Sequence, residues 1–136
     1  MTGQGTRRAE IAGAGFAGLT AAAALARRGW AVTVRERSPE IRSTGAGIYI
    51  YENGLRVLEA LDAADGALRG AVRVTGRRVT ENGRTVSETR LPPGQRVHCV
   101  ARQRLVEALA DAARRAGAEI VLNAETASAA PEGRLT

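Results

Sequence analysis

The order of apolar and polar positions predicts alternating strands and helices in the first part of the chain. A short apolar run, a glycine-rich turn and a helix occupy Arg8–Arg28, and Gly29 is the expected stop of that helix. A second strand follows at Ala31–Arg35. The short polar stretch Met1–Thr6 is expected to be frayed.

In the middle of the chain, the apolar pattern predicts a short strand, a helix and a hairpin. Ile48–Tyr51 alternates like a short strand. Asn53 is then expected to cap a helix whose apolar residues have helical spacing: Leu55, Val57, Leu58 and Leu61. Within Ala71–Leu91 the pattern has period two on either side of Asn82-Gly83, and this dipeptide is the strongest short-range signal for an antiparallel hairpin.

The end of the chain returns to strands and helices. After a break at Pro92–Gly94, we expect a strand at Val97–Val100 and a helix that ends near Ala116. Ala118–Leu122 predicts a third strand of the parallel type, and residues 123–136 are expected to begin another hairpin. The predicted fold is therefore α/β, with a parallel sheet and an inserted antiparallel hairpin.

The first turn, Gly13–Gly18, reads G-x-G-x-x-G between a strand and a helix, which is the context of a dinucleotide-binding turn. Gly13 permits the tight turn, Gly15 leaves the backbone open to a pyrophosphate, and Gly18 lets the helix pack closely on the strand. Phosphates would then lie against the free N–H groups at the positive end of that helix.

Glu36 ends the second strand, 21 positions after Gly15, where an acid accepts hydrogen bonds from ribose hydroxyls and repels a 2′-phosphate. Two alternatives to this interpretation remain open. The turn could be an ordinary one, with Glu36 a solvated acid between two arginines. Arg7-Arg8 and the alanine-rich run could instead form a signal peptide, which Glu10 disfavours because it interrupts the apolar region.

Composition narrows the class of protein. A chain of 136 residues suits one domain but not a cofactor domain together with a substrate domain. The net charge is +6, but all 20 basic residues are scattered arginines and aromatics make up only 3%, so nucleic acid is not an expected partner. One cysteine, Cys99, and the lack of a long apolar run predict a soluble, cytoplasmic protein without a membrane partner.

Taken together, the motifs resemble those of a known family. The Gly13–Gly18 turn, Glu36-Arg37, the Arg42–Gly47 segment ending Gly-Ala-Gly, and Arg102 before an apolar helical stripe occur in a characteristic order and spacing. They resemble the amino-terminal part of FAD-dependent aromatic hydroxylases, the single-component flavoprotein monooxygenases of the para-hydroxybenzoate and salicylate hydroxylase type. The resemblance covers about Arg8 to Leu122 and implies a Rossmann-like βαβ FAD-binding unit.

The resemblance also implies which residues bind FAD. The glycines of the first turn would bind the pyrophosphate and Glu36 the adenosine ribose, with Arg37 on the adenine side. Arg42 would approach the phosphates, although a plain surface charge is as good an interpretation, and Arg102 would contact the ribityl-phosphate region. The implied cofactor site comprises Gly13, Gly15, Phe16, Ala17, Gly18, Glu36, Arg37, Arg42, Ala46, Gly47 and Arg102, with Ala46 and Gly47 at the flavin end.

In the family, NADPH or NADH reduces the flavin and one oxygen atom is transferred to a small aromatic substrate, so the resemblance implies a monooxygenase. The cofactor does the difficult chemistry, and no catalytic side chain is assigned here. His98 and Cys99 are interpreted as packed residues of an apolar strand.

The family has further FAD motifs downstream, and this chain ends before them. Residues 1–136 are therefore expected to be an incomplete domain, in which 1–70 and 97–123 form the parallel βα part and 71–96 a hairpin belonging to the substrate-side sheet. A carboxy-terminal segment of the same enzyme, separate or cleaved, would complete it. The alternative is a non-catalytic or NAD-dependent nucleotide-binding module, which the hairpin and the Gly45–Gly47 segment disfavour.

Overall fold

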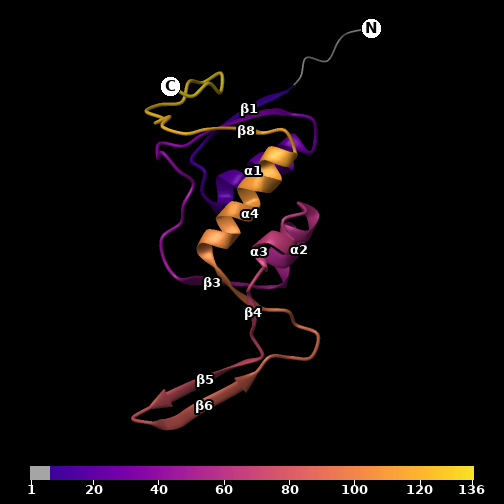
Figure 1. The fold of residues 1–136 in the computed structure, drawn as a ribbon, viewed down its shortest axis with the longest axis vertical. Coiled ribbons are helices and arrows are strands. Elements are labelled where there is room, and N and C mark those ends of the chain that lie inside the picture. Colours follow the sequence, from indigo (N-terminus) through magenta and orange to yellow (C-terminus); the bar gives the residue numbers. More distant parts are fainter. Residues whose placement is uncertain (1–6) are drawn as a thin grey trace.

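The computed structural model describes residues 7–136, and the fraying expected for Met1–Thr6 lies outside them. Its first layer is a parallel sheet in the order β1-β2-β8, formed by β1 (Arg8–Ala12), β2 (Ala31–Arg35) and β8 (Glu119–Val121). Helix α1 (Phe16–Ala26) connects β1 to β2. The predicted parallel βαβ unit is thus confirmed (Figure 1).

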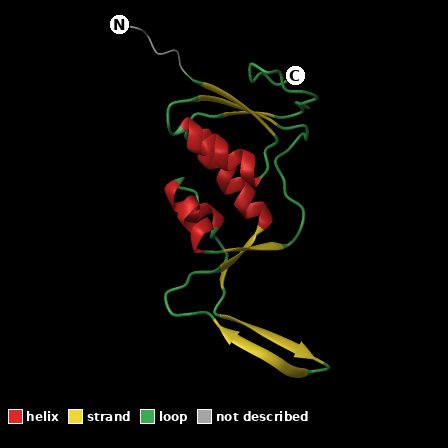
Figure 2. Ribbon diagram, turned by 180° about the vertical axis from the view of Figure 1, so that it is seen from behind, coloured by secondary structure: helices red, strands yellow, loops and turns green. Residues whose placement is uncertain are grey.

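Two helices form the core beneath this sheet. Helix α4 (Arg102–Arg115) packs along α1, as both ribbon views show (Figures 1 and 2). Alanines on both helices allow a close approach, because a methyl side chain adds little width between the helix axes. The buried residues at this contact include Leu19, Ala22, Ala23, Leu105, Leu109, Ala112 and Ala113.

A second sheet is antiparallel and has the order β3-β7-β4. It contains β3 (Gly47–Ile50), β7 (His98–Ala101) and β4 (Val72–Arg73). The segments of β3 and β7 were expected within the parallel part, but they pair with each other in opposite directions. A short apolar run shows that a strand forms and does not reveal the direction of its partner, which is why the sequence did not distinguish the two pairings.

Helix α2 (Glu52–Ala60) and the short helix α3 (Ala64–Ala67) follow β3. The prediction that Asn53 caps α2 is wrong, because the capping position is Tyr51 and its side chain makes no capping hydrogen bond. The extended backbone of Tyr51 takes β3 directly into the helix, so Asn53 falls inside the first turn. Glu52 places a negative charge there, next to the positive end of the helix.

The predicted hairpin is confirmed and projects from the body of the molecule (Figures 1 and 2). It consists of β5 (Gly76–Glu81) and β6 (Arg84–Arg90). Asn82 and Gly83 at its tip have φ of 48° and 79°, the left-handed values that a two-residue hairpin turn of type I′ requires. The hairpin starts later than expected, because Val72 pairs with Cys99 of β7 instead.

The last residues fold back toward β1. Ala129 and Leu135 form an isolated antiparallel bridge, and the N–H of Leu135 donates to a carboxylate oxygen of Glu10 at 3.0 Å. Within residues 7–136, no helix has the length and apolar character needed to span a membrane.

Candidate functional site

The three glycines of the first turn have different geometric roles. Gly13 has a left-handed φ of 91°, and its N–H donates to the carbonyl of Arg35 at 2.7 Å. A Cβ at Gly18 would overlap the carbonyl oxygen of Gly13, so the helix can lie this close to the turn only with glycine there. A Cβ at Gly15 would meet no atom within 4 Å, which leaves this part of the backbone open to a ligand.

The open backbone lies at the start of α1. Gly15 is the N-cap residue and makes no side-chain capping bond, and the first hydrogen bond into the helix runs from the N–H of Leu19 to the carbonyl of Gly15 at 3.0 Å. The N–H groups of Phe16, Ala17 and Gly18 therefore have no acceptor within the helix. The first turn also contains no acidic residue, so this end of the helix suits an anion.

Glu36 is tied to the same turn. One carboxylate oxygen accepts a hydrogen bond from the N–H of Ala14 at 2.8 Å, and the other accepts from the N–H of Ser38 at 2.9 Å. Partial burial alone would raise the pKa of Glu36, but these N–H donors outweigh it and lower the pKa below its ordinary value. The ionised carboxylate keeps further lone pairs with which to accept hydroxyl hydrogen bonds.

A recess of about 230 Å³ lies beside Glu36. Gly13, Glu36 and Arg37 line it together with residues 124–126, which follow β8. The hydroxyl oxygen of Thr126 is buried and has no hydrogen-bond partner among the described residues. Residues 124–126 could not be predicted from the sequence, because a short run of small and polar residues carries no motif.

Arg102 brings the segment after β2 to the start of α1. Its Nε donates to the hydroxyl of Ser43 at 3.2 Å, and its guanidinium lies 5.1 Å from the centre of the Phe16 ring. A Cβ at Gly45 would lie 3.1 Å from Cδ of Arg102, and Gly45 also has a left-handed φ of 97°. Gln103 fixes the same segment by accepting from the N–H of Ser43 at 2.9 Å.

Three further residues of the expected cofactor site lie in the segment after β2: Arg42, Ala46 and Gly47. Arg42 is exposed and pairs with Glu40 at 3.3 Å, and among the described residues it makes no hydrogen bond or ion pair with the glycine turn. Ala46 is exposed, and Gly47 abuts β7, where a Cβ would lie 3.2 Å from the sulfur of Cys99. The assignment of these residues to a cofactor stays a prediction.

His98 and Cys99 are both half-buried on β7. Nδ1 of His98 is buried and has no hydrogen-bond partner among residues 7–136. In the same range, no group of three or more His, Cys, Asp and Glu side chains is arranged to hold a metal ion.

Comparisons with known proteins agree with this geometry. Residues 7–134 match the family model described as FAD binding domain. The chain is 41% identical to a probable 2-heptyl-3-hydroxy-4(1H)-quinolone synthase of Rhodococcus erythropolis, over 95% of this chain and 34% of that protein. It is 45% identical to 3-hydroxybenzoate 6-hydroxylase of Polaromonas naphthalenivorans, over 46% of this chain and 16% of that protein.

Among solved structures, the chain is similar to the tetrameric form of 2-methyl-3-hydroxypyridine-5-carboxylic acid oxygenase. The TM-score is 0.90 and the identity 45%, over 97% of this chain and 35% of the other. The chain thus spans about a third of the length of the relatives that it matches over nearly all of its own length.

Proposed function

The chain belongs to the FAD-binding domain family, and on that premise we propose that it is the cofactor-binding segment of a flavin-dependent monooxygenase that hydroxylates an aromatic substrate. NADPH or NADH is the proposed reductant, and molecular oxygen the oxidant. The observation that carries the proposal is the shape of the first turn, in which Gly18 is closed by packing while Gly15 is open.

The residues present fit FAD. The backbone at Gly15 and the free N–H groups of α1 would donate to the diphosphate oxygens. Glu36 would accept hydrogen bonds from the adenosine ribose, at the edge of the recess that Thr126 also lines. Within residues 7–136, Arg102 donates a hydrogen bond only through Nε, to Ser43, so its terminal nitrogens could donate to a phosphate oxygen.

When bound, FAD supplies the redox chemistry, by accepting a hydride from the nicotinamide and activating oxygen. The residues of this chain bind and orient the cofactor, and no side chain among them is assigned a catalytic step. A plain NAD-dependent module is disfavoured, because the matching family binds FAD.

The substrate and the partner segment are also proposals. Two similar proteins are named for 3-hydroxybenzoate and for 2-methyl-3-hydroxypyridine-5-carboxylic acid, which are both ring acids that carry a hydroxyl group. We propose a small aromatic compound of this kind. Because the chain spans about a third of its relatives, a carboxy-terminal segment of the same enzyme is proposed to complete the pocket. The single cysteine favours the cytoplasm.

The visible absorption spectrum of the purified protein tests the proposal, with gel analysis of the same sample for a second polypeptide. We expect a bound-flavin spectrum, and we expect Gly15→Val to lose the flavin while keeping its far-ultraviolet circular dichroism. A folded wild-type protein that stays colourless after incubation with FAD would refute cofactor binding. Retention of the flavin by Gly15→Val would refute the role of the turn.

A further inference from the structure

A second recess, of about 760 Å³, lies far from the glycine turn. It is formed where the root of the β5–β6 hairpin meets the antiparallel sheet, at the opposite end of the molecule from β1 (Figure 1). Three aliphatic residues line it: Val74, Leu91 and Val97. The volume is within the range of small-molecule sites, and the aliphatic lining suits an apolar body.

Two tyrosines also line this recess. Tyr49 lies on β3, and Tyr51 follows that strand as the capping residue of α2. Because the backbone is extended up to Tyr51, side chains two positions apart leave it on the same side. They are 59% and 53% exposed, and they are the only tyrosines in the sequence. Exposed aromatic side chains in a recess offer a flat surface on which a ring can stack.

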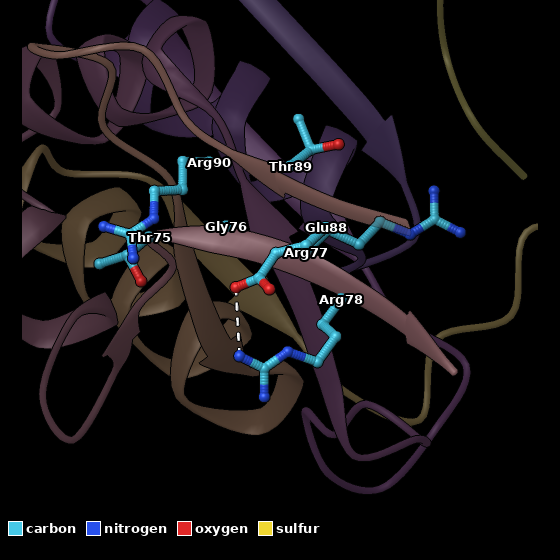
Figure 3. A pocket seen from close by; sticks show the side chains of 7 residues that line it. All are labelled: Thr75, Gly76, Arg77, Arg78, Glu88, Thr89 and Arg90. Carbon is cyan, nitrogen blue, oxygen red and sulfur yellow. Dashed lines mark hydrogen bonds and ion pairs between the residues drawn. The ribbon is translucent and has the colours of Figure 1, made fainter. Parts of the chain in front are cut away.

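Two arginines, Arg78 and Arg77, also line this recess. The one without an ion pair among residues 7–136 is Arg77. It lies opposite Thr89 in the hairpin register, whereas the next residue, Arg78, lies opposite Glu88. The two arginines therefore face different cross-strand partners, and only Arg78 faces an acid. Arg78 pairs with Glu88 at 3.1 Å, and Figure 3 shows the guanidinium of Arg77 directed away from that pair.

No carboxylate oxygen of residues 7–136 lies within 4.0 Å of the guanidinium nitrogens of Arg77, whereas Arg78 pairs with Glu88. The hairpin contains only two acids, Glu81 and Glu88, and Glu88 is already paired. A cation therefore stands without a counter-charge at the edge of an aromatic recess. A guanidinium fork matches the two oxygens of a carboxylate.

We propose that Arg77 determines substrate specificity by binding the carboxylate of an aromatic acid whose ring stacks on Tyr49 and Tyr51. That this acid is the substrate rests on the proposed monooxygenase function, whereas its binding does not. The contact is a charge-assisted hydrogen bond in an open recess, so it contributes about tenfold to affinity.

The test compares two ligands of nearly the same shape, 3-hydroxybenzoate and its uncharged amide, 3-hydroxybenzamide. Their dissociation constants for the 136-residue chain are measured by titration with ¹⁵N-resolved NMR, together with Arg77→Gln. The matched control is Arg84→Gln, because Arg84 is also an exposed hairpin arginine but lies beside the Asn82-Gly83 tip, outside the recess. The two variants remove the same charge.

We expect the acid to bind about tenfold more tightly than the amide, with amide shifts at Tyr49–Tyr51 and Arg77. Arg77→Gln should reduce acid binding to the level of the amide, and Arg84→Gln should change it less than about twofold. Equal affinities for the two ligands, an equal loss in both variants, or no binding of the acid would overturn the proposal.

The flavin content of the same samples separates the two claims. Binding of the acid through Arg77 in a protein that does not take up FAD would leave the recess assignment standing and refute the monooxygenase function. Uptake of FAD without a preference for the acid would refute the recess assignment and leave the cofactor-binding function standing.

Discussion

The backbone N–H of Ala14 donates a 2.8 Å hydrogen bond to the carboxylate of Glu36, which joins the glycine turn to the end of β2. A carboxylate that is expected to bind a ribose therefore also holds the turn in place. Substitutions at Glu36 should change the stability of the fold as well as cofactor affinity, and the pH dependence of stability isolates the first effect.

Glu36→Gln is expected to flatten the acid side of the stability profile. The pKa of Glu36 in the folded chain is below its ordinary value of 4.5, so its contribution is present above that pH and is lost as the pH falls through the folded pKa. Urea unfolding at several pH values measures this, and the free energy of unfolding of the wild type should fall more steeply below about pH 5. Parallel profiles for the two proteins would contradict the expectation.

Gly18→Ala is expected to destabilise the fold by about 1–3 kcal/mol, because the new Cβ would overlap the carbonyl oxygen of Gly13. Gly15→Ala is the matched control, since its Cβ meets nothing within 4 Å and it should lose only about 0.5–1 kcal/mol at the helix cap. Denaturant unfolding followed by circular dichroism gives both values. Equal losses would mean that the turn is not packed as described.

Arg102→Ala is expected to weaken FAD binding about tenfold, because it removes the terminal guanidinium nitrogens that are proposed to donate to a phosphate oxygen. Arg102→Lys should recover only part of the affinity, since an ammonium lacks the planar fork. Titration of flavin fluorescence measures each dissociation constant. Arg114→Ala, at the other end of α4, is the control and should bind FAD like the wild type.

Arg96→Ala is expected to raise the pKa of Glu52. The guanidinium of Arg96 donates two hydrogen bonds to that carboxylate and, with a smaller contribution from Arg56, holds its pKa at about 2. Carboxyl-carbon NMR titrations should show the pKa of Glu52 rising toward 4.5 in Arg96→Ala and rising less in Arg56→Ala. An unchanged value in Arg96→Ala would mean that the pair is not formed in solution.

Features that depend on local backbone chemistry could be predicted from the sequence. The predictions of the Gly13–Gly18 turn, of the strand that ends just before Glu36 and of the Asn82-Gly83 hairpin are confirmed, since each depends on residues that are near one another in the chain. The antiparallel pairing of β3 with β7 was not predicted, because it joins segments about 50 positions apart whose apolar pattern fits either direction.

Parts of the site escaped prediction for a similar reason. Thr126 reaches the recess beside Glu36 only because β8 lies next to β2 in the sheet. Arg77 could not be distinguished from the other hairpin arginines until the register showed that Glu88 faces its neighbour Arg78. Both depend on strand pairing, which a single sequence does not specify.

The exposure of the hairpin has a consequence for proteolysis. Every residue of β6 is exposed, and a two-stranded ladder without a packed face is only marginally stable in water. The sequence contains no lysine, so trypsin cleaves this chain only after arginine, and four of its sites lie at Arg77, Arg78, Arg84 and Arg90. Limited trypsin digestion should therefore nick the hairpin first, while the packed α1 and α4 helices protect the glycine turn.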